Sequence, residues 1–121
     1  MANTFKVVTF AAEPASAGTP YVMYTVASST TTDLLGLVLS NINTTAVTAE
    51  VELVSTTSSR GGANNVANGT SFLIKDVNIP TGSSLEILSG GKVVLEAGDK
   101  IQIDCSVADK LSGTLSIMEI T

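Results

Sequence analysis

The sequence contains no histidine and no tryptophan, and its one cysteine is Cys105. Without histidine, Ser-His-Asp and Cys-His catalytic sites are excluded, and most enzyme classes would lack their usual proton-transfer group. A single cysteine cannot form an intrachain disulfide, so nothing marks an oxidising compartment. Cys105 stands on the apolar side of an alternating strand pattern and is expected to be a core thiol. We therefore predict that the protein is not an enzyme.

Charged residues are scarce as well. Six basic and eleven acidic side chains make up 14% of the 121 residues, with a net charge of −5. The basic residues are scattered singly, which argues against nucleic acid and against an anionic membrane as partners. No signal peptide and no apolar run of membrane-spanning length is recognisable, so we expect assembly in the cytoplasm.

Three short patterns could carry chemistry, and each has a simpler explanation. Glu50 and Glu52 share one strand face like paired catalytic carboxylates, but this spacing is equally that of a solvated strand exterior, and aromatic residues are only 4% of the chain. Asp99 ends an Ala-Gly-Asp turn in which it should accept local backbone hydrogen bonds. Residues 89–92 lack the spacing of a phosphate loop and predict a hairpin turn. We expect no metal and no cofactor.

Short runs rich in β-branched and apolar residues, separated by turn formers, predict nine strands. They lie near residues 4–10, 20–26, 34–42, 46–55, 70–77, 83–88, 91–96, 99–107 and 112–120. Glycine and proline interrupt the chain too often for a helix of more than one turn. The predicted fold is a single all-β domain over residues 1–121, an antiparallel, jelly-roll-like β-sandwich of about eight to nine short strands.

Alternation along two of these strands predicts which side chains face the core. In the first strand the core side should carry Val47, Ala49, Val51 and Leu53, and in the second it should carry Ile101, Ile103, Cys105 and Val107.

Two apolar segments do not alternate. Leu34, Leu35 and Leu37 belong to a nearly continuous apolar run, which indicates a strand covered on both faces. The C-terminal run is apolar on both sides at Met118 and Ile120, as a terminus held by a neighbour would be. These five residues are the candidate subunit contact, with a second copy of the chain as one cover.

Two segments are expected to be loops. Residues 55–69 are too polar and glycine-rich to pack, so they should project as an interaction loop. Its candidate contact residues are Arg60, Gly61, Gly62, Asn64, Asn65 and Asn68. Residues 11–19 are the other predicted open loop, because Pro14 and Gly18 discourage strand pairing.

Several phrases of the sequence resemble small β-rich virion structural proteins of tailed bacteriophages, including cyanophages. They are the threonines and leucines of residues 30–37, then FLIKDVNIPTGSSLEIL, GGKVVLEAGDKIQI and the closing LSIMEIT. The resemblance implies a subunit present in many copies on the particle.

Our first expectation is a capsid decoration (cement) protein on the virion head that binds the major capsid protein and forms a homotrimer at local threefold positions. The alternative is a tail, neck or fibre-associated subunit with a receptor- or carbohydrate-binding role, for which residues 55–69 would be the recognition element.

Overall fold

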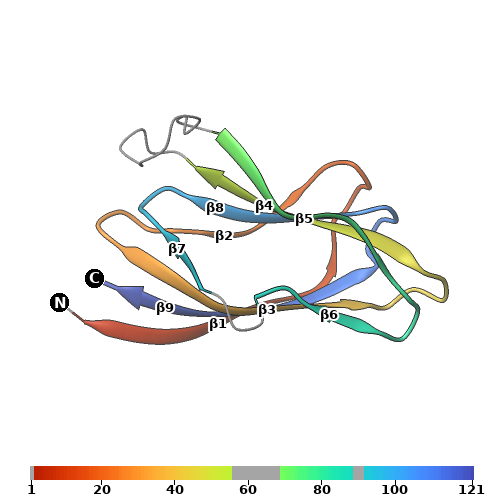
Figure 1. Cartoon of the computed structure of the whole chain (residues 1–121), viewed down its shortest axis with the longest axis horizontal. Coiled ribbons are helices and arrows are strands. Elements are labelled where there is room, and N and C mark those ends of the chain that lie inside the picture. The colour runs from red at the N-terminus through yellow and green to blue at the C-terminus, as the bar shows by residue number, and fades with distance from the viewer. Residues whose placement is uncertain (1, 56–68, 89–91) are drawn as a thin grey trace.

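A computed structural model describes residues 2–55, 69–88 and 92–121 (Figure 1). These residues form nine strands in two antiparallel sheets and contain no helix, which confirms the all-β sandwich. Each of the nine predicted strands is present, with ends that differ by a few residues. The two sheets lie one above the other in Figure 1. Buried hydrophobic side chains from both sheets form one core.

The first sheet has the strand order β1-β9-β3-β6, and β7 also pairs with β3. The second sheet has the order β2-β8-β4-β5. Strands that follow one another in the chain mostly alternate between the sheets, which is the jelly-roll arrangement. The bounds in the first sheet are β1 Asn3–Glu13, β3 Thr31–Asn41, β6 Ser84–Glu86, β7 Val93–Leu95 and β9 Leu111–Ile120. In the second sheet they are β2 Tyr21–Thr25, β4 Val47–Ser55, β5 Gly69–Ile79 and β8 Lys100–Cys105.

The core follows the predicted alternation in β4 and β8, with two exceptions. Val47, Ala49, Val51, Ile101, Ile103 and Cys105 are all buried. Leu53 is half-buried and packs against the edge of this core. Val107, predicted to be a core residue, is 37% exposed. That prediction was wrong because β8 ends at Cys105, so the alternation does not continue into the turn that follows.

The leucine run in β3 is explained by a β-bulge. Leu34 lies opposite Ile117 on β9, but Gly36 lies opposite the next residue, Ser116, so Leu35 is an extra residue in β3. The bulge shifts the inward-facing positions from even to odd numbers. Leu34 and Leu37 can therefore both enter the core, and both are fully buried. The apolar run is unbroken because the bulge changes which side chains face inward, in a strand that has one buried face.

Two turns have the backbone geometry that their residues favour, and the second is the predicted Ala-Gly-Asp turn. The amide of Ser83 donates to the carbonyl of Pro80 across a turn in which Gly82 has φ +71°. In the second turn Gly98 has φ +88°, and the Asp99 carboxylate accepts the Glu96 amide at 3.0 Å. Positive φ is the conformation for which glycine is selected. The predicted hairpin turn at residues 89–92 falls largely on 89–91, outside the described residues.

The predicted loop over residues 11–19 is shorter than expected. β1 continues to Glu13, which pairs with Leu111 after a register shift that begins at Phe10. A bulge therefore keeps residues 11–13 in the sheet, and only the chain from Pro14 onward leaves it.

Candidate interaction surface

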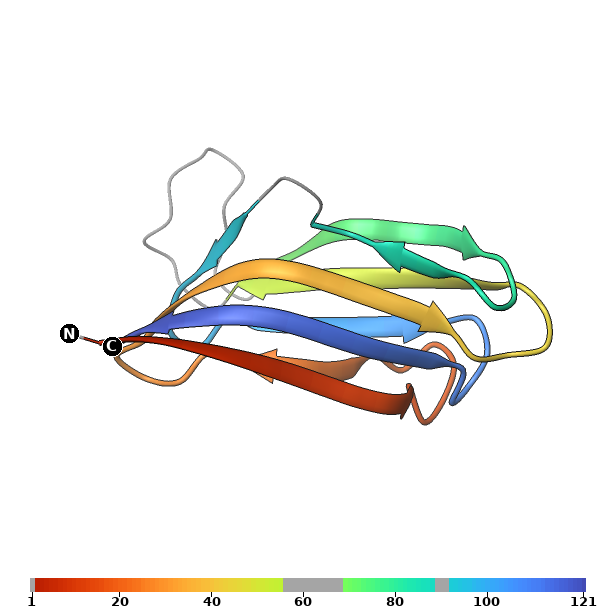
Figure 2. The same ribbon diagram turned by 90° about the horizontal axis from the view of Figure 1, so that it is seen from below.

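The outward side of the first sheet carries an unusual number of apolar side chains. Directly opposite residues of antiparallel strands point to the same side of a sheet. Phe5 lies opposite Met118, Met118 opposite Asp33, and Asp33 opposite Val94, so these four share the outward side. Figure 2 shows this side, with β1, β9 and β3 as long neighbouring strands and β1 at the edge.

We call this surface the outer apolar face and define it by its six apolar residues. They are Phe5, Val7, Leu35, Val94, Met118 and Ile120. Phe5 is 72% exposed, Val7 62% and Val94 52%, and the other three are half-buried. Single exposed apolar residues are common, but several on one sheet face are typical of a surface that meets a partner.

The five residues predicted as a subunit contact separate into two groups. Leu35, Met118 and Ile120 belong to the outer apolar face. Leu34 and Leu37 lie in the core with no exposed area, which corrects their assignment as contacts. The physical reason is the β3 bulge, which turns them inward. The predicted loop contacts Arg60, Gly61, Gly62, Asn64, Asn65 and Asn68 lie outside the described residues.

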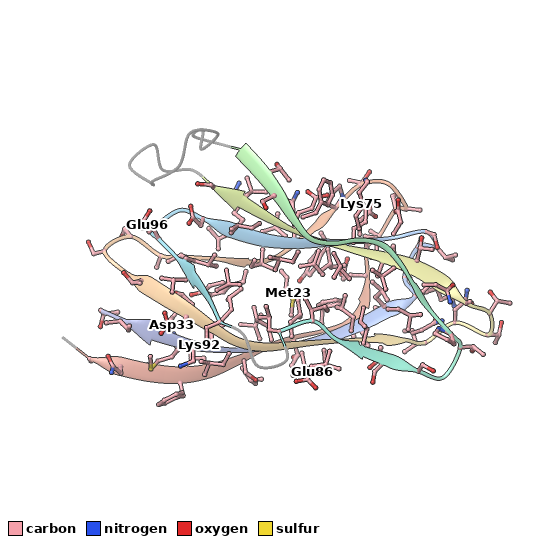
Figure 3. All side chains as sticks on the ribbon, viewed as in Figure 1. Met23, Asp33, Lys75, Glu86, Lys92 and Glu96 are labelled. Carbon is pink, nitrogen blue, oxygen red and sulfur yellow. The ribbon has the colours of Figure 1, made fainter. Side chains whose placement is uncertain are left out.

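The side chains in Figure 3 show the contrast between the interior and the two outer sides. Met23 lies between the sheets, while Glu86 projects from the first sheet and Lys75 from the second. Met23 is 6% exposed and is part of the core. Asp33 is a charged residue that lies among the side chains of the outer apolar face, opposite Met118 and Val94. A partner for this face would therefore combine apolar contacts with a hydrogen-bond donor for the Asp33 carboxylate.

A polar network lies between the sheets at the end of the sandwich where the outer apolar face is richest. The Lys6 ammonium is 2.6 Å from Glu119 Oε1, and the Tyr24 hydroxyl donates to Glu119 Oε2 at 2.6 Å. Tyr24 also shares a 2.8 Å hydrogen bond with the Thr32 hydroxyl. The network joins β1, β2, β3 and β9.

The network changes the acidity of two of its members. The hydrogen bonds from Lys6 and Tyr24 lower the pKa of Glu119, because they stabilise its charged form. Burial, followed by the hydrogen bond to Glu119, raises the pKa of Tyr24 to about 12. Lys6 is therefore paired with a charged carboxylate of the same chain at neutral pH.

The outward side of the second sheet has a different character, with an acidic hollow of about 360 Å³. Glu50 on β4 lies directly opposite Asp104 on β8, and Asp76 on β5 also lines the hollow. Burial and a hydrogen bond with Asp76 raise the pKa of Glu50, although Lys75 lies 3.4 Å away. The amide of Gly18 donates to Asp104. Sequence reasoning missed this cluster, because cross-strand register brings its members together.

The residues considered for catalysis occupy ordinary structural positions. Glu52 is 8% exposed and accepts a 2.7 Å hydrogen bond from the Gln102 amide, so it is not the solvated neighbour of Glu50 that the strand pattern predicted. Cys105 is 4% exposed, and burial raises the pKa of its thiol, in agreement with a core thiol. Within residues 2–55, 69–88 and 92–121, no group of three or more acidic or cysteine side chains is arranged to hold a metal ion.

Phe5, Val7 and Val94 were not singled out from the sequence. A signal was present in β1, where apolar residues occupy both faces: Phe5 and Val7 on one, Val8 and Phe10 on the other. A solvated edge strand needs only one apolar face. The second face could therefore have been recognised as a surface that has to be covered.

Comparison with known proteins identifies no family for the chain. No protein-family model matches it, and no curated protein matches it. One solved structure, described as "Bacillus endospore appendages form a novel family of disulfide-linked pili", aligns over 99% of this chain and 87% of its own. The identity is 17% and the TM-score 0.47, which is too distant to carry an argument about function. In the described residues there is also no helix long and apolar enough to cross a membrane.

Proposed function

We propose that this chain is a structural protein of a bacteriophage virion, a decoration (cement) protein that binds the head surface and stabilises the capsid lattice. The observation that carries the proposal is the outer apolar face, where Phe5, Val7 and Val94 are each more than half exposed. The resemblance of the sequence to virion structural proteins of tailed phages supplies the class of particle. The major capsid protein and further copies of the chain are the proposed partners.

The energetics of the face suit a protein that acts in many copies. Fully burying a Val or Phe side chain contributes about 1.5–3 kcal/mol, and these residues are already partly covered. The three most exposed side chains together thus contribute roughly 3–5 kcal/mol, which is small against the cost of immobilising a free subunit. One copy on its own would bind weakly. On a particle, neighbouring copies that also contact one another bind more tightly through multivalency. Copies that bind the assembled lattice but not free capsid subunits stabilise that lattice.

The direct test is the number of copies per purified particle, measured by quantitative mass spectrometry against the major capsid protein. A ratio near one, or a simple fraction such as one third, is the expected result for a lattice-wide decoration protein. A far lower ratio would refute the head assignment and move the chain to the tail, neck or fibre. Absence from the particle would refute the virion proposal.

A matched pair of substitutions tests whether the outer apolar face makes the contact. Val94→Asp places a charge on this face, and Val22→Asp does the same on β2 of the other sheet, where Val22 is 41% exposed. We expect Val94→Asp to lower occupancy on stripped particles at least tenfold and Val22→Asp to leave it unchanged. Equal occupancy for both variants would show that the first sheet does not face the particle.

A further inference from the structure

Most edges of the two sheets carry features that prevent pairing with another strand. On β5, Lys75 and Asp76 are exposed charges, Asp76 has φ +51°, and the register with β4 shifts twice. β2 has five residues and a register shift between Val22 and Tyr24, while β6 and β7 have three residues each. Short strands, bulges and exposed charges are the usual protection of sheet edges.

β1 is the least protected of these edges. It pairs with β9 in unbroken register from Asn3 to Phe10, and in the described part of the chain no strand pairs with its other edge. The one charge in this stretch is Lys6, which lies on the inner side, pairs with Glu119 and has a side chain that is 52% exposed. β1 therefore presents a long, regular edge, and the unpaired backbone groups of such an edge are a template for pairing with a further strand.

The hydrogen bonds at the chain ends show which backbone groups that edge presents. Ala2 and Thr121 exchange two hydrogen bonds, the Ala2 amide to the Thr121 carbonyl at 3.1 Å and the reverse at 2.9 Å. In an antiparallel pair such exchanges occur at every second residue. The even-numbered residues of β1 therefore bond to β9. The amide and carbonyl groups of Phe5, Val7 and Thr9 point to the free edge.

We propose that the occupant of this edge is β1 of a second copy, paired antiparallel across a twofold axis at Val7. An antiparallel strand pair is self-complementary, so a strand can pair with its own copy about such an axis. Opposed side chains lie on the same side of a sheet, and the outward residues of β1 are odd-numbered. If the outward sides of both copies coincide, each outward residue therefore lies opposite an odd-numbered residue of the second copy. The two residue numbers of every opposed pair then add up to an even number. The twofold axis must therefore lie between two copies of the same residue.

Charge and the bulge argue against the two axes next to Val7. An axis at Lys6 would set two lysines directly opposite each other, which is unfavourable. An axis at Val8 would place Phe5 opposite residue 11, beyond Phe10, where the register shifts. With the axis at Val7, Phe5 lies opposite Thr9 of the second copy, and all three pairs present backbone groups to the edge. About six hydrogen bonds result, two for each pair.

This pairing also extends the outer apolar face. Phe5 and Val7 of each copy lie on the same side of the joined sheet, and Phe5 is diagonal to Val7 of the second copy, within reach of an aromatic ring. The proposed twofold differs from the homotrimer expected from the sequence, which stays a prediction. A contact about 23 Å long and 10 Å deep covers roughly 250 Å² per copy, well below the roughly 800 Å² of a stable complex. The dimer is therefore weak in dilute solution.

The test uses proline as a probe of the edge. Val7→Pro removes the amide that points to the free edge and leaves the β9 hydrogen bonds in place, as proline on an edge strand allows. Sedimentation equilibrium of the parent up to millimolar concentration should show a monomer-dimer equilibrium. Val7→Pro and Val7→Lys should shift its dissociation constant at least tenfold, with unchanged circular dichroism. Val94→Lys, on the same sheet side but away from the edge, should dimerise like the parent.

Cross-linking tests the register and detects even a weak dimer. Opposed residues in a hydrogen-bonded pair have Cα atoms about 5.5 Å apart, within the range that a disulfide spans. Val7→Cys should form a covalent dimer under mild oxidation, and Val94→Cys should remain a monomer, while native Cys105 is buried and unreactive. A parent that stays monomeric, a trimer, a dimer that survives Val7→Pro, or equal cross-linking at both positions would overturn the proposal. None of these results depends on a virion, so the function proposed above stands or fails separately.

Discussion

Gly113→Ala tests how closely the two terminal strands pack in the core. Gly113 on β9 lies directly opposite Phe10 on β1. A Cβ at Gly113 would meet the Phe10 ring at Cε2 and at Cζ (2.5 Å), closer than carbon atoms can approach, and at Cδ2 at a tight 3.0 Å. The ring is 8% exposed and makes an edge-to-face contact with Tyr21, with centroids 5.4 Å apart at 61°. One methyl group would therefore displace a buried aromatic ring.

The expected magnitude combines three effects. Overpacking a core costs about 1–3 kcal/mol. Losing the aromatic pair with Tyr21 costs about 0.5–1.5 kcal/mol more. Replacing a strand glycine by alanine returns about 0.5–1 kcal/mol, because the unfolded chain loses freedom. We expect a net loss of about 2 kcal/mol in the free energy of unfolding, which lowers the Tm by roughly 6–12 °C for a domain of this size.

The assay is urea and thermal unfolding beside a matched control. Gly36 lies in the same sheet, has no positive φ, and its added Cβ would meet nothing within 4 Å. Gly36→Ala should be neutral or should raise stability by up to about 1 kcal/mol. The double variant Gly113→Ala with Phe10→Leu should lose less than the sum of the single losses, because the shorter side chain leaves room for the methyl group. A Gly113→Ala protein as stable as the parent would refute the packing argument.

Three other substitutions test the network and the core. Glu119→Gln should lower stability at pH 7 by about 1–2 kcal/mol, because it removes the carboxylate that holds Lys6 and accepts from Tyr24. Because the pKa of Glu119 is lowered in the folded protein, the stability that its carboxylate contributes is present above the pKa of the unfolded chain and disappears as pH falls through the folded value. The destabilisation caused by Glu119→Gln should therefore be smaller at pH 3 than at pH 7. An equal destabilisation at both pH values would contradict this reasoning. Ile103→Asp should abolish soluble folding, because it buries an unpaired carboxylate at a site with no exposed area, and a cooperatively melting variant would show that the face assignment is wrong. Cys105→Ser should lower the free energy of unfolding by at most about 2 kcal/mol. Loss of a biochemical activity in this variant would instead indicate a catalytic thiol.

Local sequence signals predicted the strands and turns well because both are local physical effects. The strand that ends at Ile79 stops at Pro80, which cannot donate to a ladder, and Gly82 then supplies the positive φ of the turn. Asp99 caps its own turn as its position after Gly98 predicted. In each case the deciding interaction lies within four residues of chain, so the pattern is visible without knowing the neighbours in the sheet.

Predictions that depended on the phase of a strand were less reliable. A β-bulge adds one residue and reverses the inward and outward positions beyond it. In β3 this happens at Leu35, so a run that indicated two covered faces belongs to a strand with one buried face. The contact role assigned to Leu34 and Leu37 failed for this reason. Nothing in the residues themselves distinguishes an extra residue from a continuous strand.

The position of a strand within its sheet depends on partners far away in the sequence. Among the described strands β1 pairs with β9 alone and is therefore an edge. This pairing joins the two ends of the described chain, as the two hydrogen bonds between Ala2 and Thr121 illustrate. The sequence shows β1 as one apolar strand among nine. Because β1 is an edge strand, the placement of the few charged residues affects whether it can pair with another strand. With 14% charged residues, this chain pairs Lys75 on β5 with Glu50 and Lys6 on β1 with Glu119, and it leaves Phe5 and Val7 exposed beside the free edge. Selection for a solitary monomer would favour a charge or a proline at Val7, where either could be accommodated without disturbing the β9 ladder.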